Sequence, residues 1–306
     1  MFASDFTIKH AISISELTGI GKTTIGFVLV GFSTSLTNLS VVVFTLTNPE
    51  RNIGLAIGDV LGSNIVNIAL ILGVCVILVV LKRPRFPSFM LTLAKGEMGD
   101  LNFGLFIASI IPMTLLYIGY ASRFVGVVLM AFFVFYMILL ARKKQQRDRR
   151  AVPVGTNTLR KHLLLEFTGA VVVIASAFFI INSATYIATS VNVPSTIVGA
   201  TIVAFGTSIP VFSTSTTSVR KGHFDLALSN IIGECFINIT LILGMALVIS
   251  PLVEIAAFSN LVLFSLITNL FLWYFLSSEK IGWREGALLI FLYGVFLVVS
   301  FGGYRA

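Results

Sequence analysis

One acidic residue, Glu234, stands inside an apolar stretch of the sequence, in SNIIGECFIN (229–238). Between Leu226 and Ile249 it is the only acid. A charged side chain at the centre of a bilayer costs about 2.5–3.5 kcal/mol on insertion scales. Such a residue needs a partner, a water-filled path or a function, and a functional role is favoured for Glu234.

Polar residues recur every fourth position in two segments of the chain. The first segment carries Asp59, Ser63 and Asn67, and the second carries Asn230, Glu234 and Asn238. On a helix this spacing places each set on one face, as an oxygen-rich stripe. Carboxylate and amide oxygens suit hard cations such as Na⁺, Ca²⁺ and Mg²⁺, so Glu234, Asp59, Asn67 and Asn238 are predicted metal ligands. For Asp59, a position near the outer membrane surface is the alternative.

Two further polar groups precede these stripes. Thr34, Ser35 and Asn38 form the first group, and Thr207 and Ser208 form the second. Gly206 and Pro210 bracket the second group, so its helix is expected to open there and to free backbone carbonyls. Membrane helices also use Ser, Thr and Asn to hold neighbouring helices together, and this alternative stays open for each of these residues.

The elements that position these residues are membrane-spanning helices. The chain has 306 residues, of which 57% are hydrophobic and 11% are charged, and its mean hydropathy is +0.99. The apolar runs have the length of about 20 residues that crosses a bilayer, and they lack the alternation of a membrane barrel. The predicted spans are 24–48, 54–81, 102–119, 123–141, 163–190, 196–219, 225–249, 257–277 and 284–302.

The basic residues orient the chain. Eight of the 21 Lys and Arg fall in the segment 142–161, which we expect to be a solvated cytoplasmic loop. If this loop is cytoplasmic and successive spans cross the membrane in alternating directions, 18 Lys and Arg lie on the cytoplasmic side and 3 on the outer side. This distribution agrees with the positive-inside rule. The C-terminus is then outside.

The chain also contains an internal repeat. GFVLVGFSTSL (26–36) aligns with GATIVAFGTSI (199–209), and residues 55–73 align with residues 226–244 at 9 of 19 positions. The two copies begin on opposite sides of the membrane. Inverted repeats with polar, glycine-broken segments at matching positions are typical of secondary transporters, whose binding site lies at the midplane. We therefore predict one inverted repeat at 1–141, a basic cytoplasmic linker at 142–162 and the second repeat at 163–306.

The sequence gives little indication of a transition-metal site, an enzyme or a cofactor. Cys75 and Cys235 lie in predicted spans, and no cluster of His and Cys indicates a transition-metal site. The sequence shows neither a nucleophile–base pair nor an HExxH motif, so it gives no indication of an enzyme. No cofactor and no nucleic-acid partner are expected; the expected partners are the lipid bilayer and inorganic cations, and the oligomeric state stays open.

The repeated segments 26–36 with 55–73, and 199–209 with 226–244, resemble the two alpha-repeats of the cation/calcium exchanger superfamily, which includes the sodium/calcium exchangers. The family pattern GTS-[LAI]-PE, followed by GN-x-x-GSN-x-x-N, corresponds to STSLTN (33–38) with GDVLGSNIVN (58–67), and to GTSIPV (206–211) with SNIIGECFIN. The resemblance implies an all-α fold of about ten helices, the first truncated here, in two inverted five-helix repeats. By position it implies a ligand set of Thr34, Ser35, Asn38, Ser63, Asn67, Thr207, Ser208, Glu234 and Asn238.

The chain departs from the family pattern at its two principal carboxylates. Asn38 and Val211 stand where the family has Glu, whereas Glu234 replaces a Ser and Asp59 replaces an Asn. The formal charge at the centre is therefore still two, but it is relocated.

These features predict a secondary active antiporter of the prokaryotic plasma membrane that exchanges Ca²⁺, or another divalent cation, for Na⁺ or H⁺ by alternating access. A carboxyl group inside the membrane can carry a proton, so proton coupling is compatible with the sequence. The alternatives are a Mg²⁺ or monovalent-cation/H⁺ exchanger of the same fold, and a transport-deficient paralogue that acts as a membrane subunit.

Overall fold

The computed structural model describes residues 25–47, 52–82, 104–107, 110, 120–147, 183, 186, 190, 193–250, 253–254, 258–277 and 282–302. Helices dominate this part of the chain, and four short segments labelled η have the wider turns of a π-helix. In chain order the elements are η1 (Gly26–Val30), α3 (Gly31–Thr47), α4 (Ile53–Ile65), η2 (Val66–Leu72), α5 (Gly73–Lys82), β1 (Tyr120–Ala121), α7 (Arg123–Arg147), α9 (Ser195–Val198), η3 (Gly199–Val203), α10 (Ala204–Thr207), α11 (Ile209–Arg220), α12 (Phe224–Ile237), η4 (Asn238–Ile242), α13 (Leu243–Ile249), β2 (Val253–Glu254), α14 (Ser259–Ser277) and α15 (Trp283–Gly302).

Six helices in the described residues are long and apolar enough to cross a membrane, and a bent pair gives a seventh. They run over Gly26–Thr47, Ile53–Leu81, Arg123–Leu140, Phe224–Ile249, Ser259–Leu276 and Trp283–Gly302, with Ser195–Thr207 and Ile209–Arg220 as the bent pair. Seven of the predicted spans are confirmed to within a few residues. The predicted spans 102–119 and 163–190, the first helix implied by the resemblance and most of the basic segment lie largely outside the described residues.

The two halves of the chain build equivalent substructures. The wide turns of η1 and η3 begin at aligned glycines, Gly26 and Gly199. Gly62 packs against the backbone of Ala200, and its counterpart Gly233 packs against the backbone of Phe27. At each contact a glycine of one half lets the backbone of the other half approach closely.

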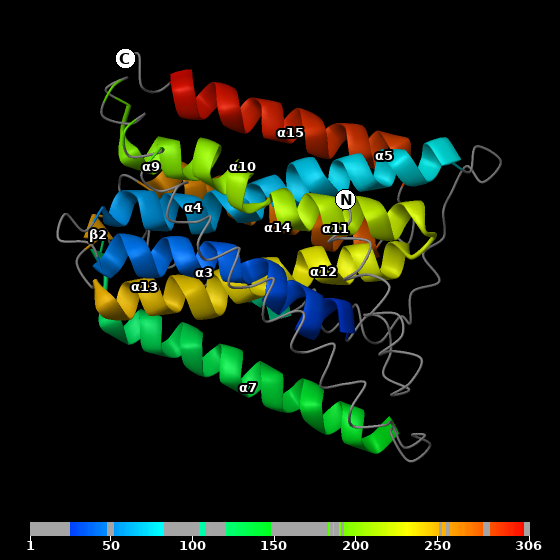
Figure 1. Cartoon of the computed structure of the whole chain (residues 1–306), viewed down its shortest axis with the longest axis horizontal. Coiled ribbons are helices and arrows are strands. Elements are labelled where there is room, and N and C mark those ends of the chain that lie inside the picture. The colour runs from blue at the N-terminus through cyan, green and yellow to red at the C-terminus, as the bar shows by residue number, and fades with distance from the viewer. Residues whose placement is uncertain are drawn as a thin grey trace.

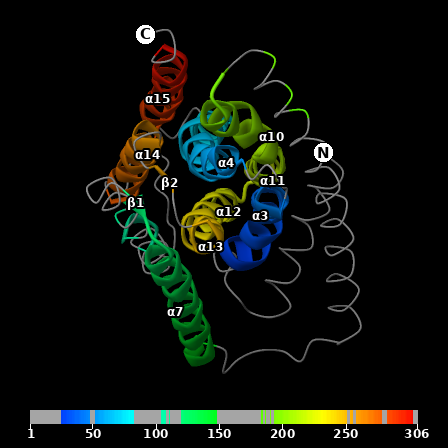
Figure 2. The ribbon, with the colours of Figure 1, turned by 90° about the vertical axis from the view of Figure 1, so that its left-hand side faces the viewer.

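The helices form a central group and an outer row. Figures 1 and 2 show α3, α4, α10, α11, α12 and α13 gathered together, whereas α7, α14 and α15 stand along one side. α13 packs on α7, and the equivalent helix of the first half, α5, packs on α15. α4 and α12 are apolar on almost every face and are buried along nearly their whole length, as central helices should be.

The second half contains a broken helix, whereas the segment aligned with it in the first half is continuous. α10 ends at Thr207 and α11 begins at Ile209, with a bend of 42° between the two segments. Pro210 stands in the first turn of α11 and has no N–H to donate to the carbonyl of Gly206. The expected opening of this helix is confirmed, while the aligned helix α3 runs unbroken over Gly31–Thr47.

Residues before α7 and before α14 meet in a short antiparallel pair, β1 with β2. Tyr120 pairs with Glu254 and Ala121 with Val253. The sequence did not predict this pair, because two residues are too few for a strand pattern to be recognised.

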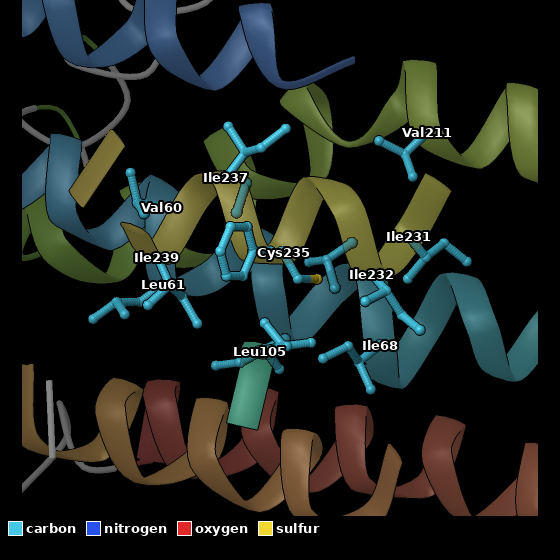
Figure 3. Packing of buried hydrophobic residues seen from close by; sticks show 14 of the residues in the cluster. Val60, Leu61, Ile68, Leu105, Val211, Ile231, Ile232, Cys235, Ile237 and Ile239 are labelled. Carbon is cyan, nitrogen blue, oxygen red and sulfur yellow. The ribbon is translucent and has the colours of Figure 1, made fainter. Parts of the chain in front are cut away.

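Aliphatic and aromatic side chains fill the space around the central helices. Figure 3 shows part of this cluster, with Ile231, Ile232 and Cys235 of α12 among its buried members. Leu105 joins the cluster from the short helical segment 104–107 and is fully buried. Buried polar residues, among them Asp59 and Glu234, also lie on these central helices.

Candidate cation-binding site

Glu234 lies in the middle of the protein, on α12. Its side chain is fully buried, and Asn38 of α3 donates a hydrogen bond from Nδ2 to its Oε1 over 3.2 Å. The side chains of Thr34 and Asn67 lie beside the same carboxyl group. The carboxyl group therefore points into the protein and toward the other half of the chain, away from lipid.

Asp59, the second carboxyl group, is also fully buried, on α4. Thr207 at the end of α10 donates to Asp59 Oδ1 over 2.8 Å, and Ser63 donates to the same oxygen over 3.4 Å. Asp59 is therefore enclosed by protein side chains, while its depth in the membrane stays a prediction. Asp59 is near enough to Glu234 for the two charges to repel when both are ionised.

Ser63 and Asn38 connect the two carboxyl groups. Ser63 Oγ is 3.4 Å from Asn38 Oδ1 and 3.2 Å from Thr207 Oγ1. The resulting chain of contacts runs from Asp59 through Ser63 and Asn38 to Glu234. It joins α3 and α4 of the first half to α10 and α12 of the second, so the site exists only where the two halves meet.

Several oxygens of the predicted ligands make no hydrogen bond within the described part of the chain. They are Asp59 Oδ2, Asn67 Oδ1, Ser208 Oγ, Glu234 Oε2 and Asn238 Oδ1. Buried polar atoms are almost always paired, so a group of unpaired oxygens needs an explanation. Each carboxyl group uses one oxygen inside the protein and leaves the other available.

The charges of the site are also uncompensated. The hydrogen-bond partners of Asp59 and Glu234 in the described residues are hydroxyl and amide groups, and none of them is a cation. A buried carboxylate without a positive partner is costly, so it must bind a cation or a proton. Carboxylate, amide and hydroxyl oxygens together are the ligand types that hard cations prefer.

Comparison with known proteins shows which family the chain belongs to. A model of the family described as sodium/calcium exchanger protein matches residues 1–142 and 161–302. The chain belongs to the sodium/calcium exchanger family. This assignment and the apolar helices make it an integral membrane transporter.

Two curated relatives and two solved structures illustrate how this exchanger relates to the family. It is 28% identical over 265 residues to Inner membrane protein YrbG of Escherichia coli (strain K12), covering 82% of this chain and 77% of that protein. It is 36% identical over 75 residues to the sodium/calcium exchanger MaX1 of Methanosarcina acetivorans, covering 24% and 21% of the two chains.

The solved structures are of the sodium-calcium exchanger NCX_Mj. One, soaked with 2.5 mM Na⁺ and 10 mM Sr²⁺, has a TM-score of 0.68 at 24% identity and covers 95% of this chain and 92% of the other. Another, soaked with 100 mM Na⁺ and 10 mM Sr²⁺, has a TM-score of 0.69 at 23% identity and covers 96% and 92%. This likeness confirms the predicted all-helical fold of inverted repeats.

The remaining predicted ligands of the exchanger are buried, but their contacts differ. Thr34 donates to the backbone of its own helix and lies 3.4 Å from Asn230 Oδ1. Ser35 donates to Gly31 O, and Asn238 donates to Asn64. Ser35, Ser208 and Asn238 make no direct side-chain hydrogen bond to either carboxyl group in the described residues. For these residues, as for all the others of the set, the role as ligand stays a prediction.

Three polar residues of the exchanger's centre were not among the predicted ligands. Thr37 donates over 3.2 Å to Thr207 O, one of the backbone carbonyls at the helix break. Asn230 donates to Thr214 and Ser215 of α11, and Asn64 donates to Cys235 O. Asn230 could be recognised from the sequence, because it belongs to the stripe of polar residues at every fourth position that includes Glu234 and Asn238. The partners of Thr37 and Asn64 depend on which helices touch, which local spacing does not encode.

Val211 occupies the place of the second family carboxylate and is fully buried. Figure 3 shows it on α11 among the side chains of the apolar cluster.

Proposed function

We propose that this exchanger is a secondary active antiporter that moves Ca²⁺, or another divalent cation, in exchange for Na⁺ or H⁺ by alternating access. The observation that carries this proposal is the pair of buried carboxyl groups, Asp59 and Glu234. Neither has a cationic partner in the described residues, and each has one unpaired oxygen. The names of the relatives MaX1 and NCX_Mj, both sodium/calcium exchangers, agree with it.

In this mechanism the two carboxyl groups supply the charge that compensates the ion. Amide and hydroxyl oxygens complete the coordination, and the proposed ligands are Thr34, Ser35, Asn38, Ser63, Asn67, Thr207, Ser208 and Asn238, all of them buried. The ligands come from both halves, so a relative movement of the halves would open the site to one side of the membrane or to the other. No cofactor is required.

We further propose that the protein lies in the plasma membrane of a prokaryote, with the basic segment 142–161 in the cytoplasm and the C-terminus outside. The support is the 18 to 3 distribution of Lys and Arg between the two sides.

A second candidate function is exchange of Mg²⁺ or of a monovalent cation against H⁺. Val211 favours it, because an apolar side chain stands where a further carboxylate would complete a Ca²⁺ site. Ca²⁺ prefers six to eight oxygens, often with a bidentate carboxylate. The third possibility is a transport-deficient membrane subunit.

Flux into proteoliposomes tests these functions together. The purified protein is reconstituted, a Na⁺ or pH gradient is imposed, and uptake of ⁴⁵Ca²⁺, Mg²⁺ and ²²Na⁺ is compared. Glu234→Gln removes the charge with little change of shape and should abolish exchange. The matched control is Glu285→Gln, since Glu285 caps the start of α15 through Gly282 N and lies outside the site.

The outcomes separate the candidates. Gradient-driven Ca²⁺ uptake that is lost in Glu234→Gln and kept in Glu285→Gln supports the divalent antiporter. Uptake of Na⁺ or Mg²⁺ alone, with the same dependence on Glu234, supports the second candidate. Absence of all flux in the wild type, or full flux in Glu234→Gln, contradicts the proposed role of the site.

A further inference from the structure

Six consecutive hydroxyl residues, STSTTS (213–218), lie in α11 of the second half. Residues 214–218 are buried, and α11 packs along α12, the helix that carries Glu234 (Figure 1). α11 ends at Arg220, on the side that the distribution of Lys and Arg assigns to the cytoplasm. None of the six is a proposed ligand, so these hydroxyl groups need an explanation of their own.

Asn230 of α12 connects the hydroxyl residues to the central site. Its Nδ2 donates to Thr214 Oγ1 over 3.1 Å and to Ser215 Oγ over 3.2 Å. Its Oδ1, at the other end of the amide, lies 3.4 Å from Thr34 Oγ1, and Thr34 lies beside the carboxyl group of Glu234. A continuous series of polar groups therefore leads from Glu234 to α11.

The series continues along α11 toward its end at Arg220. Thr214 Oγ1 donates to Pro210 O, and Ser218 Oγ donates to Thr214 O, each over 2.9 Å. A hydroxyl group that donates to its own helix keeps oxygen lone pairs with which it can contact water or a cation. In the described residues the bond of Ser218 stays within α11, so holding two helices together does not account for this hydroxyl.

The first half is apolar at the aligned positions. Extending the alignment of 26–36 with 199–209 along α3 places Val41 and Val42 opposite Thr214 and Ser215. Both valines are fully buried and belong to apolar clusters. Apolar constrictions exclude water and ions, whereas hydroxyl and amide oxygens replace part of an ion's hydration shell. At this distance from the site, the polar lining is therefore a property of the second half.

We infer that Asn230, Thr214 and Ser215 line the path by which the transported cation passes between Glu234 and the cytoplasmic side, with Ser218 farther along it. This inference rests on the proposed function and adds to it the route of the ion. The path is closed in the present conformation, where these side chains are buried, and takes up water when the halves move. Its oxygens are neutral and cannot compensate a buried charge, so they speed the passage of the ion without holding it.

Modification of introduced cysteines from each side of the membrane tests the route. Ser215→Cys and Val42→Cys are prepared in right-side-out and inside-out vesicles and treated with a cationic, impermeant methanethiosulfonate. Cys75 and Cys235 are buried and stay in place, so the wild type gives the background rate. A thiol reacts only where the reagent reaches it, so Ser215→Cys should react about tenfold faster from the cytoplasmic side than from the outer side. Val42→Cys, the aligned and equally buried control, should stay at the background rate from both sides.

The rate and affinity of the reconstituted protein test the hydroxyl groups themselves. Thr214→Val/Ser215→Ala removes both acceptors of Asn230, so the initial rate of exchange should fall about tenfold. The affinity for ⁴⁵Ca²⁺, or for ²²Na⁺ if the wild type exchanges Na⁺ alone, should be unchanged, since the carboxyl groups remain. Thr216→Val is the matched control, because in the described residues its hydroxyl donates to the backbone of its own helix. Thermal unfolding reports whether each variant is folded, and cysteine modification decides the matter if the double variant is not.

The inference is overturned if Ser215→Cys reacts no faster than Val42→Cys, or reacts faster from the outer side. It is also overturned if the folded double variant exchanges at the rate of Thr216→Val, or if its affinity falls as much as its rate. In each of these cases the proposed antiport stands, since the wild type still exchanges ions. If the wild type exchanges no ion, the proposed function fails and the inference fails with it.

Discussion

The contact between Gly233 and Phe27 gives a sharp prediction about how the two halves hold the site. Gly233 precedes Glu234 on α12, and a Cβ added there would lie 2.6 Å from Phe27 O and 2.8 Å from Phe27 Cα. Carbon atoms normally stay about 3.5–4.0 Å from their neighbours. In Gly233→Ala, α12 and η1 must therefore separate by roughly 0.7 Å, the difference between the 2.8 Å to Phe27 Cα and about 3.5 Å.

The energetic cost can be bounded from the same contact. Overpacking in a core costs about 1–3 kcal/mol. The obstructing atoms are backbone and cannot rotate away, so the upper end applies, and the helix propensity of Ala returns about 1 kcal/mol. We expect a net loss of about 2 kcal/mol in the free energy of unfolding. Glu234 would move with its helix, and its 3.2 Å bond to Asn38 would stretch to about 4 Å.

Thermal unfolding in detergent, with and without cations, measures both effects. Gly233→Ala should unfold at a lower temperature than the wild type and should lose most of the stabilisation that added cations give. Gly294→Ala on α15 is the matched control, since no heavy atom of the described residues lies within 4 Å of its added Cβ. If Gly233→Ala unfolds like Gly294→Ala and keeps its response to cations, the close approach of the halves does not position the site.

Two more substitutions test individual contacts. Thr207→Val removes the hydroxyl that bonds Asp59 over 2.8 Å, and the loss of a charged hydrogen bond of about 1.5–3 kcal/mol should weaken cation binding about tenfold or more. Thr201→Val is the control, because among the described residues the hydroxyl of Thr201 bonds to Ile197 O of its own span, and it should leave binding intact. Equal affinities in the two variants would contradict the role of the Thr207 contact. Pro210→Ala supplies the missing N–H and should straighten the 42° bend, slowing exchange in proteoliposomes while equilibrium cation binding persists; an unchanged rate would show that the bend is not needed.

Much of the fold could be predicted because it depends on patterns of neighbouring residues in the sequence. Apolar runs of membrane-spanning length located seven spans, and the alignment of 26–36 with 199–209 and of 55–73 with 226–244 predicted the two related halves. The opening at Ser208 followed from Gly206 and Pro210, whose effects on a helix act within one turn. The central position of Glu234 followed from the cost of placing a carboxylate against lipid.

The pairing of side chains could not be predicted in the same way. Asn38 and Glu234 are separated by 196 residues, and Thr207 and Asp59 by 148, so these contacts depend on how helices of different halves pack. The wide turns of η2 and η4 also change the angle between successive side chains, which limits the four-residue rule at Asn67 and Asn238. The role of each ligand and the residue ranges of the two repeats and their linker stay predictions.

The unbroken α3 and its bent counterpart α10–α11 mean that the halves, although related, are not interchangeable. In a transporter with two identical inverted halves, a two-fold rotation about an axis in the membrane plane would relate the inward-open and outward-open conformations, which would then have equal energy. Here one half carries the kink, a buried Val211 and the acid Glu234, where the other carries a straight helix, Asn38 and Ser63. Swapping the roles of the halves therefore produces a different set of contacts, so in the proposed transport cycle we expect the two open conformations of the empty protein to differ in energy.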